Sequence, residues 1–262
     1  MVTHPLLPKL RQLRLSGMLD SLEVRAAQAV AGGIAPLEFL ALLLDDELGR
    51  REQRQLGVRL REAGWEEGKT LARFDFNAVP GLNRTLVMEL ATCAFLERQE
   101  NLLVCGPSGI GKSHLASALL FEAVKRGHRA LLRPVHHLLG DLQTGRGDGT
   151  HKRRMFRACT VDLLVLDDFG LRPLSAQGAD DLYEIVAERY ERRPTIITSN
   201  RALEEWPEVF GDELLANAAL DRLTHRARIL IMRGVSYRQR GRRKEGEEPA
   251  GAVKAKTEST TE

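Results

Sequence analysis

The sequence has no apolar run long enough to cross a lipid bilayer, which takes about 20 residues. The longest such run near its start, FLALLL at residues 39–44, is far shorter. No uninterrupted apolar segment followed by a cleavage site occurs in the N-terminal stretch, so the pattern of a secretory signal is missing. We therefore expect a soluble globular protein of the cytoplasm, without a membrane partner.

Cysteine is scarce as well. Cys93, Cys105 and Cys159 are odd in number and have no CxxC spacing. Each lies among apolar residues, where a reduced cysteine packs as a small hydrophobic side chain. The adjacent His136 and His137 lack a third ligand at metal spacing. The sequence therefore predicts no disulfide and no metal site built from cysteine and histidine.

The excess of positive charge is small but unevenly distributed. The formal net charge is only +3. Residues 101–160 hold ten Lys or Arg against three Asp or Glu, whereas residues 161–200 hold four against eight. This asymmetry favours an anionic partner, which could be a nucleotide, a nucleic acid or both. The basic region contains no base-reading motif such as a zinc finger.

Helical periodicity identifies residues 1–65 as a small all-helical N-terminal domain, a candidate module for DNA contact or assembly. Leucines at roughly helical spacing predict one helix over 6–30, and the glycines of AGG at 31–33 end it. Pro36 suits the first turn of a second helix, which we expect to reach Gly64.

An aperiodic connector follows the helical domain. It occupies residues 66–100, packs on the core through Phe74 and Phe76, and ends in a helix predicted over 84–98. The far end of the chain, residues 241–262, has too little apolar surface to offset the entropy of ordering it. We expect a disordered tail there.

Strands and helices alternate over residues 101–240. Apolar, strand-like runs lie at 101–105, 129–133, 162–166 and 194–198. Helical patterns lie between them, at 112–126, 135–143 and 176–192. Such alternation implies crossover connections and a parallel sheet covered by helices on both faces, so the predicted class is α/β.

The stretch GPSGIGKS, residues 106–113, matches the pattern G-x-x-x-x-G-K-[ST]. Its backbone N–H groups wrap a nucleotide's phosphates at the start of a helix, and its glycines permit the close approach. Lys112 would reach the β- and γ-phosphates, and the Ser113 hydroxyl would bind Mg²⁺. The flanking strand-like and helix-like runs argue against a glycine-rich turn that binds nothing. The expected ATP-binding residues are Gly106, Pro107, Ser108, Gly109, Ile110, Gly111, Lys112, Ser113 and His114.

Polar residues end two further apolar runs, VDLLVLDDFG and PTIITSN. Asp167 would hold Mg²⁺ at the end of its strand, and Asp168 could orient the attacking water. Many such ATPases have glutamate in the second place, and the shorter aspartate is compatible with slow turnover. Asn200 could bond the γ-phosphate or that water at the same sheet edge. The alternative without a catalytic role is that the two acids lie in an ordinary turn after the strand and that the asparagine only forms a turn.

Seven stretches of the chain follow one another in an order typical of a single family. They are LRLSGML, LALLLDDELGRREQRQL, GPSGIGKSHLA, LLVLDDFG, TIITSNRALEEW, VFGDELLANAALDRLTHRA and GVSYR. In these stretches, from about residue 5 to 240, the chain resembles the IstB-like transposition helper ATPases, which are AAA+ proteins close to the bacterial helicase loaders and the replication initiator. The phosphate loop alone would indicate only an NTPase.

This resemblance implies an AAA+ P-loop core with a five-stranded parallel sheet, in which the Asn200 strand lies between the Asp167 strand and the phosphate-loop strand. That placement would make Asn200 a sensor. The resemblance also implies that Arg222, in DRLTHRA, is an arginine finger that completes the ATP site of a neighbouring subunit. Its guanidinium would spread positive charge over the phosphoryl oxygens.

The basic stretch TGRGDGTHKRRMFR, residues 144–157, is the candidate DNA contact. It holds five Lys or Arg and one acid, and it lies between a glycine-rich loop and the helix that enters the Asp167 strand. Such a cluster could follow a phosphate backbone and release counterions, with a merely solvated loop as the alternative. Arg50, Arg54 and Arg61 share a helix face with acids, which favours a solvated surface for them. The expected DNA-binding residues are Arg146, Lys152, Arg153, Arg154 and Arg157.

The resemblance implies DNA binding largely independent of sequence, ATP-dependent self-assembly along the duplex, and delivery of that target to a cognate transposase. We therefore predict an ATPase that uses ATP and Mg²⁺ and whose hydrolysis changes or releases the assembly. A helicase loader with the same core is the main alternative, but the N-terminal module looks like that of the transposition helper. A metabolic kinase would need a lid and a second substrate pocket, for which the residues after Asn200 offer no candidate.

Overall fold

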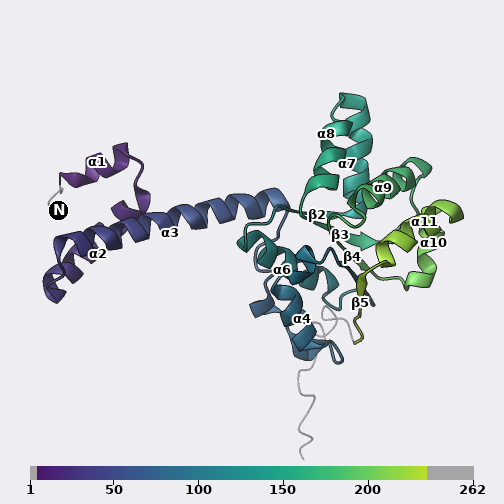
Figure 1. Cartoon of the computed structure of the whole chain (residues 1–262), viewed down its shortest axis with the longest axis horizontal. Coiled ribbons are helices and arrows are strands. Elements are labelled where there is room, and N and C mark those ends of the chain that lie inside the picture. Colours follow the sequence, from purple (N-terminus) through teal and green to yellow (C-terminus); the bar gives the residue numbers. More distant parts are fainter. Residues whose placement is uncertain (1–4, 235–262) are drawn as a thin grey trace, which may run out of the picture.

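The computed structural model describes residues 5–234, which form an N-terminal helical part and an α/β part (Figure 1). The tail expected at 241–262 and the last residues of the GVSYR motif lie outside the described residues. Within residues 5–234, no helix combines the length and the apolar character that a membrane span needs.

The N-terminal part consists of α1 (Leu6–Gln12), α2 (Ser16–Gly32) and α3 (Pro36–Ala63). The one helix predicted over 6–30 is therefore two helices. Arg14 separates them with a φ of 57°, and the Leu15 N–H donates to the Leu10 carbonyl at 2.9 Å. This left-handed ending lets Leu10 and Leu15 pack on a small apolar cluster of Met18, Leu22 and Leu43.

Close backbone approach, a buried carboxylate and an ion pair join α2 to α3. A Cβ on Gly17 would come within 2.6 Å of Glu47 Cα, so only glycine fits there. The buried Glu47 carboxylate accepts the Gly17 N–H at 2.6 Å and pairs with Arg51 at 2.7 Å. Beside it, Arg25 bonds the Asp46 carboxylate at 2.7 Å and holds the pKa of that carboxyl at about 2.

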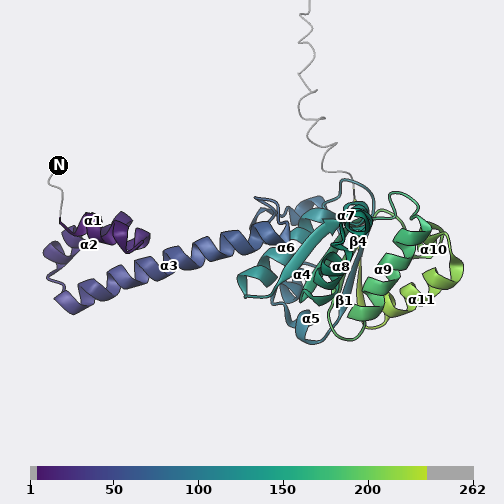
Figure 2. The same cartoon turned by 90° about the horizontal axis from the view of Figure 1, so that it is seen from above.

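Helix α3 links the two parts of the molecule (Figure 2). It has 28 residues, which is about 42 Å at 1.5 Å per residue. Its first half lies against α2, whereas Leu60 and Ala63 in its last turns are buried in the core of the α/β part. Gly64 ends the helix with a φ of 79°, close against Arg133.

The connector contains two short 3₁₀ helices, η1 (Leu71–Arg73) and η2 (Phe76–Ala78), and two α-helices, α4 (Arg84–Ala91) and α5 (Ala94–Glu97). The helix predicted over 84–98 is broken at Cys93, which has a φ of 66°. The change of direction buries Phe95 and Leu96 in the core. Phe74 is buried as predicted, and Phe76 packs against the same core cluster.

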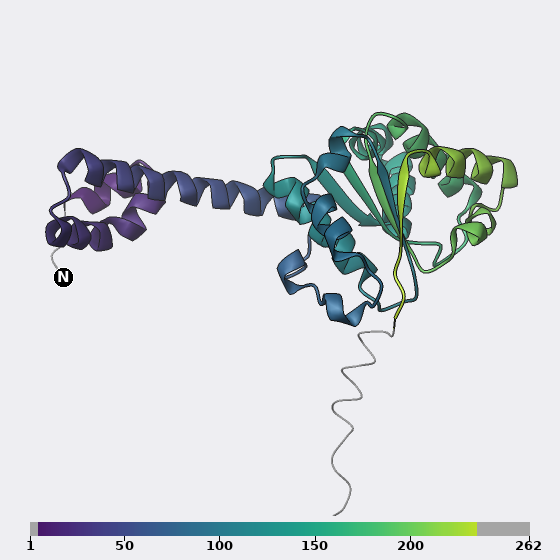
Figure 3. The same cartoon turned by 60° about the horizontal axis from the view of Figure 1, so that its bottom comes forward.

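A five-stranded parallel sheet forms the centre of the α/β part (Figure 3). Its strands are β1 (Asn101–Cys105), β2 (Ala130–Pro134), β3 (Leu163–Phe169), β4 (Thr195–Ser199) and β5 (Ala227–Ile231). Their order is β2-β3-β4-β1-β5. The strand that precedes Asn200 thus lies between the Asp167 strand and the phosphate-loop strand, which confirms the implied arrangement.

Helices cover both faces of the sheet. They are α6 (Lys112–Lys125), α7 (Val135–Asp148), α8 (His151–Thr160), α9 (Ala176–Arg189), η3 (Leu203–Glu205), α10 (Trp206–Phe210) and α11 (Glu213–Thr224). Alternate residues of one strand enter different cores: Leu102 joins the α6 side, and Leu103 joins the side of α7 to α11. Because α7 extends to Asp148, the segment predicted as a glycine-rich loop is largely helical.

Arg189, at the end of α9, is a buried cation that is only 2% exposed. Its guanidinium donates to the carbonyl oxygens of Ala158, Cys159, Val161 and Pro194 and to the hydroxyl of Thr195. These bonds join the end of α8 to the start of β4. Burial lowers the pKa of Arg189 to about 9, so the side chain stays charged at neutral pH.

Candidate nucleotide-binding site

The phosphate loop connects β1 to α6, as predicted. Three of its glycines have positive φ, namely Gly106 at 153°, Gly109 at 80° and Gly111 at 103°. A Cβ on Gly106 would also lie 2.3 Å from the carbonyl oxygen of Met232, so the chain permits no side chain at this position. The loop thus exposes backbone at the N-terminus of α6, where N–H groups bind anions well.

Lys112 is the first residue of α6, and its side chain folds back over the loop. The ammonium donates to the carbonyl oxygens of Gly106 at 2.8 Å and Pro107 at 2.9 Å. Burial lowers the pKa of Lys112, and the negative charges of Asp168 and Asp167 act against that shift. The lysine is therefore held near both the loop and the acid pair.

A cavity of about 490 Å³ lies over the loop. Residues 108–114 form one wall, and Asp168 lies in another. The connector supplies a further wall that the sequence did not reveal, made of Lys69, Arg73, Phe74, Asp75 and Ala78. The position of this wall is fixed by His114, which bonds the Thr70 carbonyl at 2.9 Å, and by the edge-on contact of the Phe74 and His114 rings.

Asp167 and Asp168 lie at the carboxyl edge of β3, next to this cavity. Asp167 is only 8% exposed, whereas Asp168 is partly exposed and lines the cavity. The strand is irregular here, since the register with β4 shifts between Leu166 and Phe169. Asp168 accordingly has a φ of 56°.

The oxygen donors at this edge suit Mg²⁺. The Ser113 hydroxyl and the Asp167 carboxylate are hard ligands, and Mg²⁺ is typically held by one or two protein groups together with water and phosphate oxygens. Within the part of the chain that the structure describes, no cluster of three or more His, Cys, Asp or Glu could hold a metal. The site therefore fits an ion that arrives with a nucleotide better than a metal caged by protein.

Asn200, the first residue after β4, is exposed. It lies among the lining residues of a neighbouring cavity of about 400 Å³, together with Gly106 and Pro107, and not among those of the cavity beside Lys112. The structure thus places Asn200 on the other side of the phosphate loop. A contact of Asn200 with the γ-phosphate stays a prediction.

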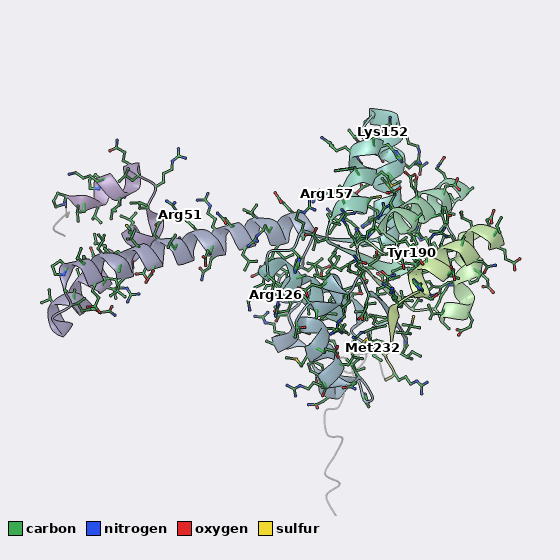
Figure 4. All side chains as sticks on the ribbon, viewed as in Figure 1. Arg51, Arg126, Lys152, Arg157, Tyr190 and Met232 are labelled. Carbon is green, nitrogen blue, oxygen red and sulfur yellow. The ribbon has the colours of Figure 1, made fainter. Side chains whose placement is uncertain are left out.

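Arg222 lies on α11 and is partly buried. Its guanidinium lies 5.3 Å from the ring centre of Tyr183 and 5.9 Å from that of Tyr190, which Figure 4 labels. It also donates to the Ala218 carbonyl at 2.7 Å. Arg226, which lies beyond the end of α11 and just before β5, is exposed and has a φ of 55°.

The predicted DNA-binding residues divide into two groups. Arg146 bonds the buried Asp181 at 2.8 Å, and Arg154 bonds Asp148 at 3.0 Å, so both cations are engaged within the protein. Arg157 is exposed but donates to the Glu62 carbonyl of α3 at 2.8 Å.

Lys152 and Arg153 project from the outer face of α8, where Figure 4 labels Lys152. On the same face, Phe156 is 68% exposed, and the sequence analysis had not singled it out. The exposed part of the basic stretch is thus a helix face with an aromatic ring and not a loop.

Residues 8–245 match the family described as IstB-like ATP binding protein. The chain belongs to this family. It is 39% identical over 243 residues to an IS21 insertion-sequence ATP-binding protein of Pseudomonas aeruginosa, which covers 93% of this chain and 92% of the relative. It is 40% identical over 234 residues to an insertion-sequence ATP-binding protein of Mycobacterium tuberculosis, and the match covers 89% of this chain and 93% of the relative. The family is thus one of transposition-associated ATPases.

Solved structures share the fold of this IstB-like chain. The DnaI structure has a TM-score of 0.54 and 24% identity, and covers 63% of this chain and 90% of DnaI. The AMPPCP-bound DnaA of Aquifex aeolicus has a TM-score of 0.54 and 21% identity, and the match covers 64% of this chain and 50% of DnaA. At these identities the likeness shows the fold alone, which is that of the AAA+ ATPases, as predicted. The IstB-like chain therefore has this fold, and its ATP-binding character rests on the family match.

Proposed function

We propose that the cavity over the phosphate loop binds ATP with Mg²⁺ and is the site of hydrolysis. The observation that carries this proposal is that Lys112, Ser113 and Asp168 line one cavity. The loop N–H groups and the Lys112 ammonium would bind the phosphates. Ser113 and Asp167 would hold Mg²⁺, which supplies positive charge against the phosphate oxygens. Asp168, on the cavity wall, would orient the attacking water.

Lys112 must change partners when ATP enters. Its ammonium is bonded to two carbonyls of the loop, and phosphate oxygens are stronger acceptors because they are charged. Exchange of the Gly106 and Pro107 carbonyls for phosphate oxygens would also bring negative charge into direct contact with this buried cation. The connector wall, with the Phe74 ring, would contact the rest of the nucleotide.

Hydrolysis would need a neighbouring subunit. Arg222 is the proposed trans-acting residue, and its contacts with Tyr183 and Tyr190 would hold it ready on the surface of α9. A guanidinium delivered to a neighbour's γ-phosphate stabilises the charge that develops there. This role makes self-assembly a condition of turnover.

Duplex DNA is the proposed assembly partner. The exposed face of α8 would contact phosphates through Lys152 and Arg153, and the exposed ring of Phe156 would contact the sugar. Contacts of this kind are independent of sequence. The bound assembly would then deliver its DNA to the cognate transposase, and hydrolysis would change or release it.

The helicase-loader alternative is supported by fold alone. DnaI covers 63% of this chain at 24% identity, whereas the insertion-sequence relative from Pseudomonas aeruginosa covers 93% at 39%. The transposition role therefore accounts for more of the sequence. A transposase that co-purifies with the ATP-bound protein would separate the two functions, because a loader would bind a replicative helicase instead.

Two substitutions test the ATP site. Lys112→Ala should abolish ATP binding and DNA-dependent assembly while the helical signal in circular dichroism is kept, whereas Asp168→Asn should bind ATP and DNA but hydrolyse slowly. Lys125→Ala, an exposed lysine at the other end of α6, is the matched control. Unchanged ATP affinity of Lys112→Ala would disprove the nucleotide site. A normal rate for Asp168→Asn would disprove the division of roles between the acids.

A further inference from the structure

Thr198 lies opposite the acid pair, at the next-to-last position of β4. Its side chain is completely buried, in a strand that has neighbours on both sides. A threonine is common in strands, so the sequence gives this residue no special weight. Its contacts in the structure distinguish it.

The irregular register places two residues of β3 against one residue of β4. Leu166 pairs with Ile197, and Phe169 pairs with Ser199. Asp167 and Asp168 therefore share Thr198 as their partner, which is the arrangement of a β-bulge. The bulge puts Asp168 in the left-handed region, at a φ of 56°, a conformation that disfavours residues other than glycine.

The Thr198 hydroxyl bonds both members of the pair. Its proton is donated to Oδ1 of Asp167, and its oxygen accepts the backbone N–H of Asp168 at 3.0 Å. The one proton of the hydroxyl is thereby committed. One side chain thus fixes the carboxylate orientation of the first acid and the backbone position of the second.

We propose that Thr198 is a positioning residue for hydrolysis, one that aims the Asp167 carboxylate at the Mg²⁺ of bound ATP and holds Asp168 beside the attacking water. This inference rests on the proposed roles of the two acids. Thr198 itself is not among the residues that line the cavity over the phosphate loop. Groups that orient a metal ligand in this way commonly change metal affinity or activity by about 10- to 100-fold.

Ser199 provides a matched control on the same strand. Its hydroxyl donates to the Phe169 carbonyl at 2.9 Å and is also buried. It therefore joins β4 to β3 with a similar bond but touches neither acid. Ser199→Ala removes an interstrand hydrogen bond of the same kind, so it separates a loss of sheet stability from a loss of positioning.

The test compares Thr198→Val, which keeps the shape and removes the hydroxyl, with Thr198→Ser, which keeps the hydroxyl. Binding of a fluorescent ATP analogue is measured in EDTA and across a Mg²⁺ titration, and ATP turnover is measured separately. In EDTA, Thr198→Val should bind like the wild type. It should need about tenfold more Mg²⁺ for half-maximal stimulation of binding and show a turnover lowered about tenfold or more. Thr198→Ser should restore both quantities, and Ser199→Ala should change neither.

Asp167→Asn distinguishes failure of this inference from failure of the ATP site. If Asp167→Asn shifts the Mg²⁺ titration but Thr198→Val does not, the positioning role is overturned and the site stands. A titration that is unchanged in both variants overturns both proposals. Equal losses in Thr198→Ser and Thr198→Val would also overturn the role, because the hydroxyl would not be the cause. Should Thr198→Val not fold, Thr198→Cys, whose thiol is a weak donor, must show the same Mg²⁺ shift.

Discussion

Substitution of Arg222 by alanine is the sharpest test of an ATPase completed by its neighbour. The change leaves Lys112, Ser113 and the acid pair of the same subunit intact. We therefore expect Arg222→Ala to bind ATP nearly normally and to hydrolyse it poorly. Arginine fingers contribute about 10³- to 10⁵-fold to turnover in other NTPases.

The contacts of Arg222 within its own subunit set the free-energy cost of releasing its side chain toward a neighbouring subunit. Contacts of a partly exposed guanidinium with two rings are worth about 0.5–1 kcal/mol each, and the bond to the Ala218 carbonyl adds about 1 kcal/mol. Release of the side chain thus costs roughly 2–3 kcal/mol. A 10³-fold effect on rate corresponds to about 4 kcal/mol. The catalytic gain exceeds the cost of release, so a surface-bound Arg222 is compatible with a finger.

The assay is DNA-stimulated ATP turnover of single variants and of mixtures, at concentrations that permit assembly. Arg222→Ala and Asp168→Asn should each hydrolyse ATP slowly, and their mixture should regain activity because Asp168→Asn subunits still bind ATP, assemble on DNA and retain Arg222. Arg226→Ala, which removes an exposed arginine just beyond the end of α11, should behave like the wild type. Full activity of Arg222→Ala, or a loss of ATP binding as severe as that of Lys112→Ala, would refute the reasoning.

Three further outcomes are expected. Replacement of both Lys152 and Arg153 by alanine should weaken DNA binding evenly across sequences and lower the salt slope by up to about 2, near 0.9 per lost contact; an unchanged slope would mean that α8 is only solvated. In urea unfolding, Arg189→Met should lower the free energy of unfolding by about 3–5 kcal/mol because it leaves buried carbonyls unpaired. The control, Arg192→Met at an exposed position, should lower it by less than about 0.5 kcal/mol. Equal losses in the two variants would contradict this explanation. Because the pKa of Asp46 is about 2 against an ordinary 3.8, its contribution to stability is complete above about pH 4 and is lost as the pH falls toward 2. Circular dichroism should show a weaker acid dependence for Asp46→Asn, and an identical acid midpoint would exclude the ion pair as the cause.

The predictions that held rest on short-range constraints. The phosphate loop needs glycines at positions of positive φ, and Gly106, Gly109 and Gly111 have them. Three of the four predicted apolar runs became the central strands β1, β3 and β4, as expected because buried parallel strands are apolar on both faces, and the fourth became the edge strand β2. The Asp167 strand could be placed in the sheet because its order was implied by the family resemblance and not by any local signal.

The features that sequence reasoning missed depend on contacts between distant residues. Nothing local distinguishes Arg146 from Lys152, yet Arg146 is paired with Asp181, 35 positions away. The connector wall beside the nucleotide cavity and the hydroxyl of Thr198 likewise acquire their roles only when separate segments meet. Even the break at Arg14 depends on packing of its neighbours onto α2 and α3, which overrides a regular leucine spacing.

The uninterrupted length of α3 makes the N-terminal helices a lever arm. The base of the arm lies at Gly64, against Arg133 of β2, and the next residue of β2, Pro134, pairs with Asp167. Asp167 and the base of the arm are therefore separated by one strand, with no hinge loop between them. A tilt of about 5° at the base displaces the far end of a helix of about 42 Å by roughly 4 Å. A tilt of this size at the base of α3 would thus be large enough to break or form contacts made by α1 and α2, without any change of structure within these helices.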